Sequence, residues 1–368
     1  MEKMINDALK KTIQQAYTQF LDSKGLKARL GQKVMIAEIA KTLGSIEADD
    51  EGVRSSEHHI CVVEAGTGTG KTVAYALAAI PIAQALEKKV VIATATVSLQ
   101  EQIVLKDLPD IIKSAGLDFS FVLAKGRSRY VCLSKLDQQL DGSEMTQTLA
   151  LYPDEMPMMA NASALELFNE LATALAKGDW QGDRDSWARD IASEDWQLIT
   201  TDHRQCTGRR CSYISQCSFY KARDKLQSAD VIVANHDLVL ADLSLGGGAI
   251  LPEPEDTIYV FDEAHHLADK AIQHFASHTR VKGTQRWAAQ AEKTVQALCE
   301  TLKELDELCS LLVSAPQQLQ AAQSALQEVY QLLEVIAVFP DISAQGFYQR
   351  HRRHRFANGV VPTALQQL

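Results

Sequence analysis

The nine residues from Glu64 to Thr72 constrain this chain more than any other stretch. They match the phosphate-binding pattern G-x-x-x-x-G-K-[ST], with Ala65 at the first glycine position, where alanine is tolerated if its φ stays negative. Glycines let the backbone turn its N–H groups inward around a phosphate. Lysine can then reach the β- and γ-phosphates, and the threonine hydroxyl can ligate Mg²⁺. The predicted ligands of nucleotide and Mg²⁺ are Ala65, Gly66, Thr67, Gly68, Thr69, Gly70, Lys71 and Thr72.

The flanking residues supply the context that this loop needs. Ile60–Val63 predicts a buried strand before the loop and Val73–Leu86 a helix after it. Without that context, a glycine-rich turn with a chance Lys-Thr would be the alternative. Further apolar runs predict strands that alternate with helices, and this alternation indicates an α/β fold with a parallel sheet. These runs are Lys89–Ala93, Phe119–Lys125, Val231–His236 and Ile258–Phe261.

An acidic pair follows the last of these predicted strands. Asp262 is expected to hold Mg²⁺ through water, and Glu263 to orient and deprotonate an attacking water. His265 is a candidate link between the nucleotide site and a neighbouring element. Acidic pairs at strand ends are common by chance, but four apolar residues before the pair and a phosphate loop earlier in the chain strengthen the interpretation.

Arg29 and Gln32 lie upstream of the loop, at a distance where they could hold an adenine, because a glutamine amide can both donate and accept at a base edge. Exposed polar side chains are the alternative for both. Thr96 and Ser98 follow the second predicted strand and could bind a nucleic-acid phosphate, cap a helix, or do both.

The composition limits the compartment and the partners. The 368 residues suffice for two or three domains, and 46% are hydrophobic. No run of about 18 apolar residues predicts a membrane span, and Met1–Leu21 lacks a signal-peptide core. We therefore expect a cytoplasmic protein with no membrane partner. In a reducing compartment, seven cysteines favour metal binding or burial over disulfides.

The charge changes sign along the chain. The net charge of −10 argues against a uniformly basic surface for nucleic acid, although local patches decide binding. Residues 141–202 hold 13 acidic and 3 basic side chains. Residues 203–225 hold six basic side chains and one acid, Asp224. The six are Arg204, Arg209, Arg210, Lys221, Arg223 and Lys225. They form either a nucleic-acid contact or a solvated face, as does the late stretch Arg350–Arg355.

Four cysteines lie between the phosphate loop and the acidic pair. Cys132 is separated by 73 residues from Cys206, which forms a C-x4-C-x5-C pattern with Cys211 and Cys217. Four thiolates can hold Zn²⁺ or an iron–sulfur cluster, and structural zinc usually takes shorter pairs. The wider spacing suits the larger cluster better, and zinc stays the alternative. Cys61, Cys299 and Cys309 lie in apolar patterns and are expected to be core thiols.

Together these motifs resemble a known family. The glycine loop, Thr94–Gln102 and Asp262-Glu263-Ala264-His265 resemble motifs I, Ia and II of superfamily 2 helicases. The arrangement of the cysteines narrows the resemblance: one follows Gly126-Arg127-x-x-Tyr-x, and the three others come before motif II. This arrangement is similar to that of the XPD-like iron–sulfur helicases, and most closely to that of the bacterial DinG-type helicases. The resemblance covers essentially the whole chain but only the first part of the family's length.

The resemblance implies a function. Family members use ATP to move 5′→3′ along single-stranded DNA and open duplexes, forks and DNA–RNA hybrid structures, and their four cysteines hold a [4Fe–4S] cluster. It implies a RecA-like motor domain in two parts, 1–115 and 223–267, around an iron–sulfur insertion at 116–222, with a truncated helical arch-like domain at 268–368. A nucleoid-associated, cytoplasmic location and a role in DNA repair would follow.

Two features of the family are not found. Neither motif III nor a second motor domain with its arginine finger follows residue 267, so we expect a truncated helicase with little activity of its own. The alternative function is a non-catalytic iron–sulfur module that binds nucleic acid and retains the phosphate loop. A nuclease is a more distant alternative, because no Asp/Glu/Lys nuclease cluster is seen.

Overall fold

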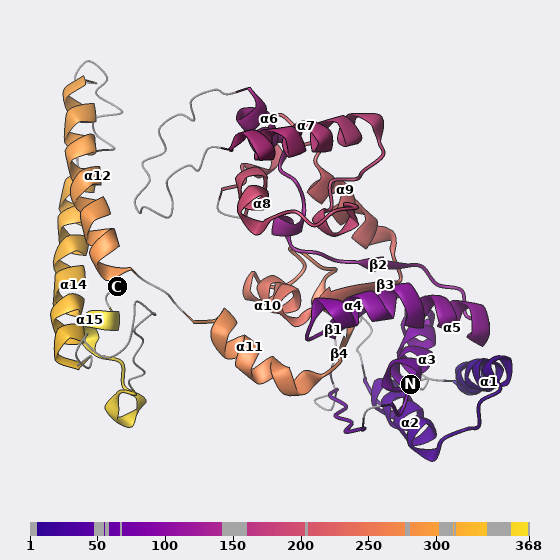
Figure 1. Cartoon of the computed structure of the whole chain (residues 1–368). Coiled ribbons are helices and arrows are strands. Elements are labelled where there is room, and N and C mark those ends of the chain that lie inside the picture. Colours follow the sequence, from indigo (N-terminus) through magenta and orange to yellow (C-terminus); the bar gives the residue numbers. More distant parts are fainter. Residues whose placement is uncertain are drawn as a thin grey trace, which may run out of the picture. The chain divides into compact units, whose positions relative to one another are not determined.

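A computed structural model describes most of the chain as two compact units. Unit 1 consists of residues 1–143 and 159–276, and unit 2 of residues 144–158 and 277–368. The elements of each are labelled in Figure 1. The structure describes all residues except 1–5, 48–54, 56–58, 67, 142–159, 203–204, 277–279, 302–311, 313, 337–354 and 367–368.

Four parallel strands form the centre of unit 1, in the order β2-β3-β1-β4. Ala93 of β1 is in register with Ala234 of β3 on one side and with Phe261 of β4 on the other, so these three strands end together. This confirms the α/β class. The strands are β1 (Lys89–Thr94), β2 (Phe121–Leu123), β3 (Val231–Asn235) and β4 (Thr257–Phe261).

Alternate residues of the strands face two separate hydrophobic cores, as a sheet covered by helices on both faces requires. One core holds Val90, Ile92 and Val233 together with apolar side chains of helices α1, α2, α3 and α5. The other holds Val91 and Ile232 with side chains of α9 and α10. The helices of the first face are α1 (Asp7–Lys24), α2 (Leu30–Gly44), α3 (Lys71–Ala85) and α5 (Leu108–Ala115), and those of the second are α9 (Ser218–Ser228) and α10 (His236–Ser244).

Between β1 and α5 the chain forms an α-helix followed by a π-helical turn. Thr96 caps α4 (Val97–Gln102) by accepting a hydrogen bond from the Leu99 amide at 3.4 Å, so the capping role expected for this residue is confirmed. A π-helical turn, Ile103–Asp107, then joins α4 to α5. Helix α11 (Leu267–His274) follows the short turn after β4.

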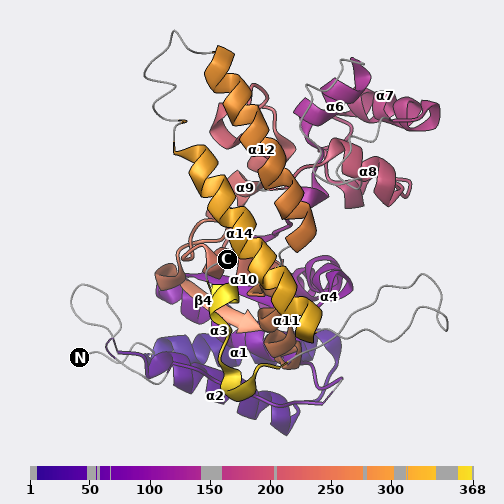
Figure 2. The same cartoon turned by 90° about the vertical axis from the view of Figure 1, so that its left-hand side faces the viewer.

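A third hydrophobic core lies in the segment between β2 and α9. It is built by α6 (Leu133–Leu140), α7 (Ala162–Lys177) and α8 (Ser193–Ile199) around Phe168, Trp180 and Trp196. Figures 1 and 2 both show these helices gathered at one end of unit 1, with α1 and α2 at the other.

Unit 2 contains a helical hairpin. Helices α12 (Val281–Thr301) and α14 (Ala315–Ile336) pack side by side, and Glu292 accepts hydrogen bonds from Gln320 at 2.6 Å and Gln323 at 3.3 Å. Lys282 lies over the Tyr330 ring at 4.1 Å. A short helix, α15 (Thr363–Gln366), follows. No described helix of either unit combines the length and apolar character of a membrane span.

The prediction of a buried strand at Ile60–Val63 is wrong. These residues form no strand, and the side chains of Ile60 and Val62 are 76% and 90% exposed. Cys61, expected in a core, is exposed with them. The run has strand propensity, but a strand also needs a neighbour, and no described strand pairs with the free edge of β4.

Candidate nucleotide site and cysteine pocket

The glycine loop has the backbone shape that its sequence requires. Gly68 and Gly70 have φ values of 75° and 79°, which residues with a Cβ rarely adopt. A Cβ on Gly70 would lie 2.2 Å from Gln32 Nε2. Helix α3 begins directly after Gly70, so its unpaired N–H groups and dipole face the loop. The geometry therefore suits a bound phosphate.

Lys71 and the acidic pair come together although 192 residues separate Lys71 from Glu263. Lys71 Nζ donates to Glu263 Oε1 at 2.7 Å, and both side chains are about three-quarters buried. This hydrogen bond raises the pKa of Lys71 and lowers the pKa of Glu263. The carboxylate of Glu263 therefore neutralises the lysine of the phosphate loop.

Asp262 lies deeper than Glu263 at the end of β4. Burial, with a contribution from the Glu263 charge, raises the pKa of Asp262. The hydroxyl of buried Tyr75 is 3.5 Å from Asp262 Oδ2, at the long limit of a hydrogen bond. A carboxylate that is half-buried at a strand end is a suitable ligand for a hydrated divalent cation, because a cation would stabilise its charged form. Thr72 lies beside Lys71 in the first turn of α3.

The turn that follows β4 is held by several hydrogen bonds. The Asp262 amide donates to the Ala93 carbonyl at 2.8 Å, and the His266 amide to the Glu263 carbonyl at 3.1 Å. Glu263 itself has a φ of 53°. His265 Nδ1 lies 3.5 Å from Glu263 Oε2, so the structure brings His265 next to the acidic pair, although its side chain is 65% exposed.

Arg29 and Gln32 both contact the glycine loop. Arg29 Nη1 donates to the Gly68 carbonyl at 2.6 Å, and Gln32 Nε2 to the Gly70 carbonyl at 3.4 Å. The Tyr17 hydroxyl supports them, because it donates to Gln32 Oε1 at 3.1 Å and accepts from the Arg29 amide at 3.3 Å. The two side chains predicted near the base thus lie beside the loop.

Four cysteines line one pocket. Cys132, Cys206, Cys211 and Cys217 all border a cavity of about 30 Å³ whose walls also include Tyr130, Phe219 and Tyr220. No three His, Cys, Asp or Glu side chains in the described residues converge at distances that suit a single metal ion. The donor set itself, four thiols around one space, fits an iron–sulfur cluster.

The pocket already offers hydrogen bonds to sulfur. Arg127 Nη1 donates to Cys206 Sγ at 2.9 Å, and the Gly208 amide to the same sulfur at 3.4 Å. Donors of this kind stabilise thiolates that ligate a metal. Arg127 also lies over the Phe219 ring at 4.0 Å, and Arg223 lies over that ring at 5.2 Å.

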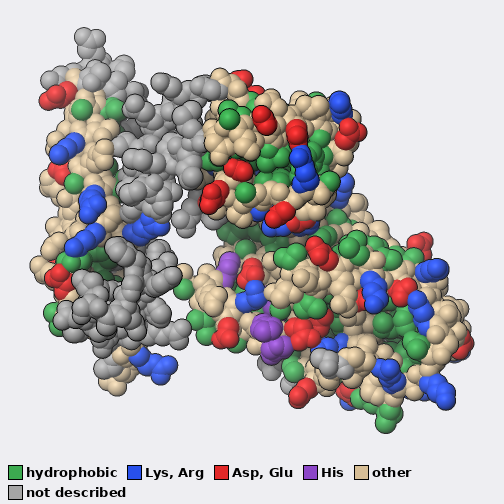
Figure 3. Space-filling model, in the orientation of Figure 1, with side chains coloured by type: hydrophobic (Ala, Val, Ile, Leu, Met, Phe, Trp, Pro, Cys, Tyr) green, Lys and Arg blue, Asp and Glu red, His purple; other side chains and the backbone are tan. Residues whose placement is uncertain are grey.

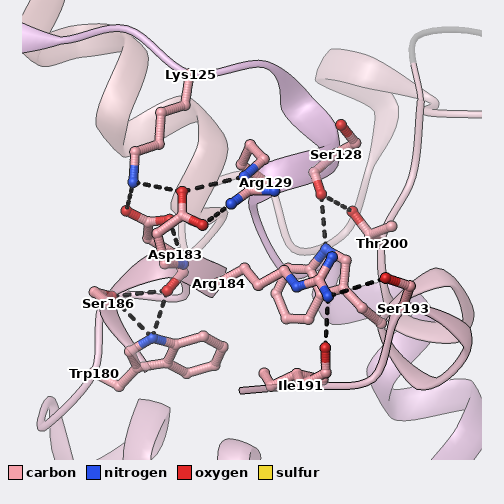
Figure 4. A network of polar contacts seen from close by, with 12 residues as sticks. Lys125, Ser128, Arg129, Trp180, Asp183, Arg184, Ser186, Ile191, Ser193 and Thr200 are labelled. Carbon is pink, nitrogen blue, oxygen red and sulfur yellow. Dashed lines mark hydrogen bonds and ion pairs between the residues drawn. The ribbon is translucent and has the colours of Figure 1, made fainter. Parts of the chain in front are cut away.

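A polar network fixes the segment that leads to the first cysteine (Figure 4). Lys125 pairs with Asp183 at 2.5 Å and with Asp185 at 2.9 Å, and Arg129 also pairs with Asp185. The Ser128 carbonyl accepts hydrogen bonds from Trp196 at 2.7 Å and Thr200 at 3.2 Å. The Cys132 amide then donates to the Ile199 carbonyl at 2.7 Å. The charges of Lys125 and Arg129 are thereby neutralised within the protein.

The basic residues around the pocket divide into two groups. Arg127 and Arg223 are engaged, the latter through hydrogen bonds to the carbonyls of Ala249 at 2.9 Å and Ile250. Arg209, Arg210, Lys221 and Lys225 are exposed. On the face of the molecule drawn in Figure 3, acidic and basic side chains of unit 1 are interspersed.

Some expected residues cannot be placed. Thr67, Arg204, Cys309 and residues 350–354 lie outside the described residues. Cys299 is partly buried in α12.

Sequence reasoning missed three residues of the site: Tyr17, Tyr75 and His236. His236 Nε2 lies 2.9 Å from the Asp262 carbonyl. Of these three, only His236 could have been suspected from the sequence. It directly follows a buried apolar run, and the carboxyl ends of parallel strands are where ligand-binding side chains gather.

Comparison with known proteins agrees with the motifs. The model of the DEAD/DEAH box helicase family matches residues 51–154, and the DEAD_2 model matches residues 201–284. The chain is 38% identical over 367 residues to "ATP-dependent DNA helicase DinG" of Photobacterium profundum, an alignment that covers 99% of this chain and 49% of that protein. It is 32% identical over 343 residues to the proteins of the same name from Escherichia coli (strain K12) and Salmonella typhimurium (strain LT2), with 92% of this chain and 45% of each relative covered.

The chain is also similar to a solved structure named XPD_Helicase, with 15% sequence identity and a TM-score of 0.36. This match covers 84% of this chain and 51% of the chain in that structure. The chain spans about half the length of the curated relatives it matches. Over nearly all of its own residues, the resemblance of this chain to the DinG-type DNA helicases is confirmed.

Proposed function

We propose that this chain is the N-terminal part of an ATP-dependent DNA helicase. The observation that carries the proposal is the meeting of Lys71 and Glu263, 2.7 Å apart, at the carboxyl end of a parallel sheet. The relatives named ATP-dependent DNA helicase DinG support it. Ligands of parallel α/β sheets bind at this edge.

Each residue of the site has a role in phosphoryl transfer. Residues 65–72 bind the phosphates of ATP, with Lys71 at the β- and γ-phosphates. Thr72 and Asp262 hold Mg²⁺, which when bound neutralises charge on the phosphates. Glu263 orients the attacking water and takes its proton, and His265 contacts Glu263 from the turn behind it. Arg29 and Gln32, which donate hydrogen bonds to carbonyls of the loop, are the proposed contacts of the base.

We also propose that Cys132, Cys206, Cys211 and Cys217 hold a [4Fe–4S] cluster. Their shared pocket and the two hydrogen bonds to Cys206 Sγ support this assignment. The cluster would fix residues 206–217, which have little regular structure, against Cys132 and the polar network beside it.

Single-stranded DNA is the proposed polymer ligand, with forks and DNA–RNA hybrids as structures opened in the 5′→3′ direction. The exposed cations Arg209, Arg210, Lys221 and Lys225 are the proposed phosphate contacts. Lys221 and Lys225 are four residues apart on α9, so they share one helical face. We propose the domain limits 1–115, 116–222, 223–267 and 268–368, and a second motor domain as the partner that completes the ATPase.

The test is Mg²⁺-dependent binding of a fluorescent ATP analogue to the 368-residue chain. Lys71→Ala should weaken binding at least tenfold, because it removes the cation that meets the phosphates. Lys113→Ala is the matched control, since Lys113 is an exposed lysine on α5 of the same unit. In a protein that also contains the second motor domain, Lys71→Ala should abolish unwinding. Equal binding by the two variants would refute the nucleotide site.

A further inference from the structure

His236 is a buried histidine that the proposed chemistry does not use. It is the first residue of α10, directly after β3, and its side chain is fully buried. Its Nε2 lies 2.9 Å from the carbonyl oxygen of Asp262. A carbonyl can only accept, so Nε2 must carry the proton in this contact. Nδ1 has no hydrogen-bond partner among the described residues.

The carbonyl that His236 contacts belongs to the peptide between Asp262 and Glu263. The other end of that peptide is also held, because the Glu263 amide donates to Asp262 Oδ1 at 3.1 Å. The orientation of a peptide plane fixes the φ of the residue that follows it. Glu263 has φ 53° and ψ 42°, in the left-handed region that side chains with a Cβ disfavour.

This conformation places the Glu263 carboxylate. From its left-handed position at the end of β4, Glu263 reaches Lys71 in the first turn of α3 at 2.7 Å. If the peptide plane turned, Glu263 would relax toward a more favourable backbone region and its side chain would leave this position. A disfavoured backbone conformation persists only where its surroundings hold it in place.

We propose that His236 is a positioning residue for Glu263: its Nε2–H group holds the Asp262 carbonyl and so maintains the left-handed turn that aims the Glu263 carboxylate. His236 reaches this carbonyl from β3 across the end of β1, whose Ala93 carbonyl accepts from the Asp262 amide. The role of Glu263 in catalysis rests on the proposed function, but its placement by His236 does not.

Two variants of similar size separate donation from packing. In His236→Gln, the side-chain amide can donate in place of Nε2–H. In His236→Leu, the apolar side chain fills the space and has no donor. Amide hydrogen exchange is measured by mass spectrometry on the 368-residue chain without nucleotide, in peptides that cover residues 262–267.

We expect His236→Leu to raise exchange at residues 262–267 at least tenfold, because the Glu263 and His266 amides lose their fixed acceptors. We expect His236→Gln to stay within about threefold of the unaltered chain, because one donor replaces another. Equal exchange in the two variants would overturn the proposal, since packing would then account for the histidine. Because no nucleotide is present, this result stands whether or not Lys71→Ala affects ATP binding.

A measurement on the unaltered chain covers the case in which a variant does not fold. With ¹⁵N-labelled histidine, the NMR spectrum at pH 7 should contain an imidazole with its proton on Nε2 and slow exchange of that proton with water. Absence of such a protected Nε2–H imidazole, or a buried ring protonated on Nδ1 alone, would overturn the proposal.

Discussion

The ion pair between Lys71 and Glu263 engages the lysine that nucleotide phosphates would contact in the proposed site. Nucleotide phosphates must take Lys71 from a carboxylate that holds it at 2.7 Å. Replacing Glu263 by Gln keeps the size of the side chain but removes the charge. We therefore expect Glu263→Gln to bind Mg-ATP more tightly than the unaltered chain, while it hydrolyses ATP far more slowly.

The magnitude follows from the burial of the pair. The two side chains are 25% and 27% exposed, so the pair lies between a surface ion pair and a buried one. Surface pairs contribute about 0.2–1 kcal/mol and hydrogen bonds to charged groups about 1.5–3 kcal/mol. We take about 1–2 kcal/mol for this pair, which is a factor of about 5–30 in the dissociation constant. In a protein that also contains the second motor domain, loss of the base should slow hydrolysis by about 10²–10⁴.

The assay is an equilibrium titration with a fluorescent ATP analogue and Mg²⁺ at constant ionic strength. Glu166→Gln, on the exposed face of α7, removes one negative charge elsewhere in unit 1 and is the matched control. The gain in affinity should appear only for Glu263→Gln and should shrink as salt rises, because salt screens the pair in the unaltered chain. Equal or weaker binding by Glu263→Gln would refute the view that this ion pair competes with nucleotide.

Three further predictions follow from the geometry. Replacing any one of Cys132, Cys206, Cys211 or Cys217 by Ser should remove iron and sulfide from anaerobically purified protein, whereas Cys61→Ser should not. Stoichiometric zinc without iron in the unaltered chain would contradict the proposed cluster. Replacing Lys221 and Lys225 together by Ala should weaken single-stranded DNA binding and reduce its salt dependence. The slope of log binding constant against log salt concentration should become shallower by about 0.7 for each phosphate that is no longer neutralised. An unchanged slope would exclude the two lysines as phosphate ligands. Burial lowers the pKa of His236 below its ordinary 6.5, while its backbone hydrogen bonds to Asp262 and Ala93 and the charge of Asp237 raise the pKa and the charge of Lys270 lowers it. As the pH falls, the unfolded chain therefore binds a proton on this histidine more readily than the folded chain does. The free energy of unfolding, measured by urea titration, should fall from pH 7 to pH 5 by less in His236→Gln than in the unaltered chain.

The sheet could be predicted where the apolar run is continuous and has a strand beside it. The runs that became β1, β3 and β4 are continuous and apolar, and such runs are typical of parallel strands. The phosphate loop and the acidic pair could be found because their chemistry demands fixed residue types at fixed spacing. The run Ile60–Val63 has the same composition, yet it forms no strand, because pairing depends on a neighbour that a local pattern cannot reveal.

The supporting contacts of the site could not be predicted from the sequence. Tyr17, Tyr75 and His236 act through one or two hydrogen bonds to residues elsewhere in the chain. No motif marks the two tyrosines, and only the place of His236 at a strand end hinted at its role. Likewise, Arg223 belongs to the basic run expected to meet DNA or solvent, yet its guanidinium is bound to backbone carbonyls of residues 249 and 250. Charge patterns show where cations occur, but only the fold shows which of them are already engaged.

The position of β4 at the edge of the sheet has a consequence for handling the protein. Only β1 pairs with β4 among the described strands, so the outer N–H and C=O groups of Thr257–Phe261 are open to another strand. This segment has no charged residue and is rich in β-branched and aromatic side chains, the composition of segments that assemble between chains. The strand that aims the acidic pair thus combines an edge position with the composition of an aggregation-prone segment. Charges introduced to keep the chain in solution belong at Ile60 and Val62, whose side chains are already in water, and not in β4.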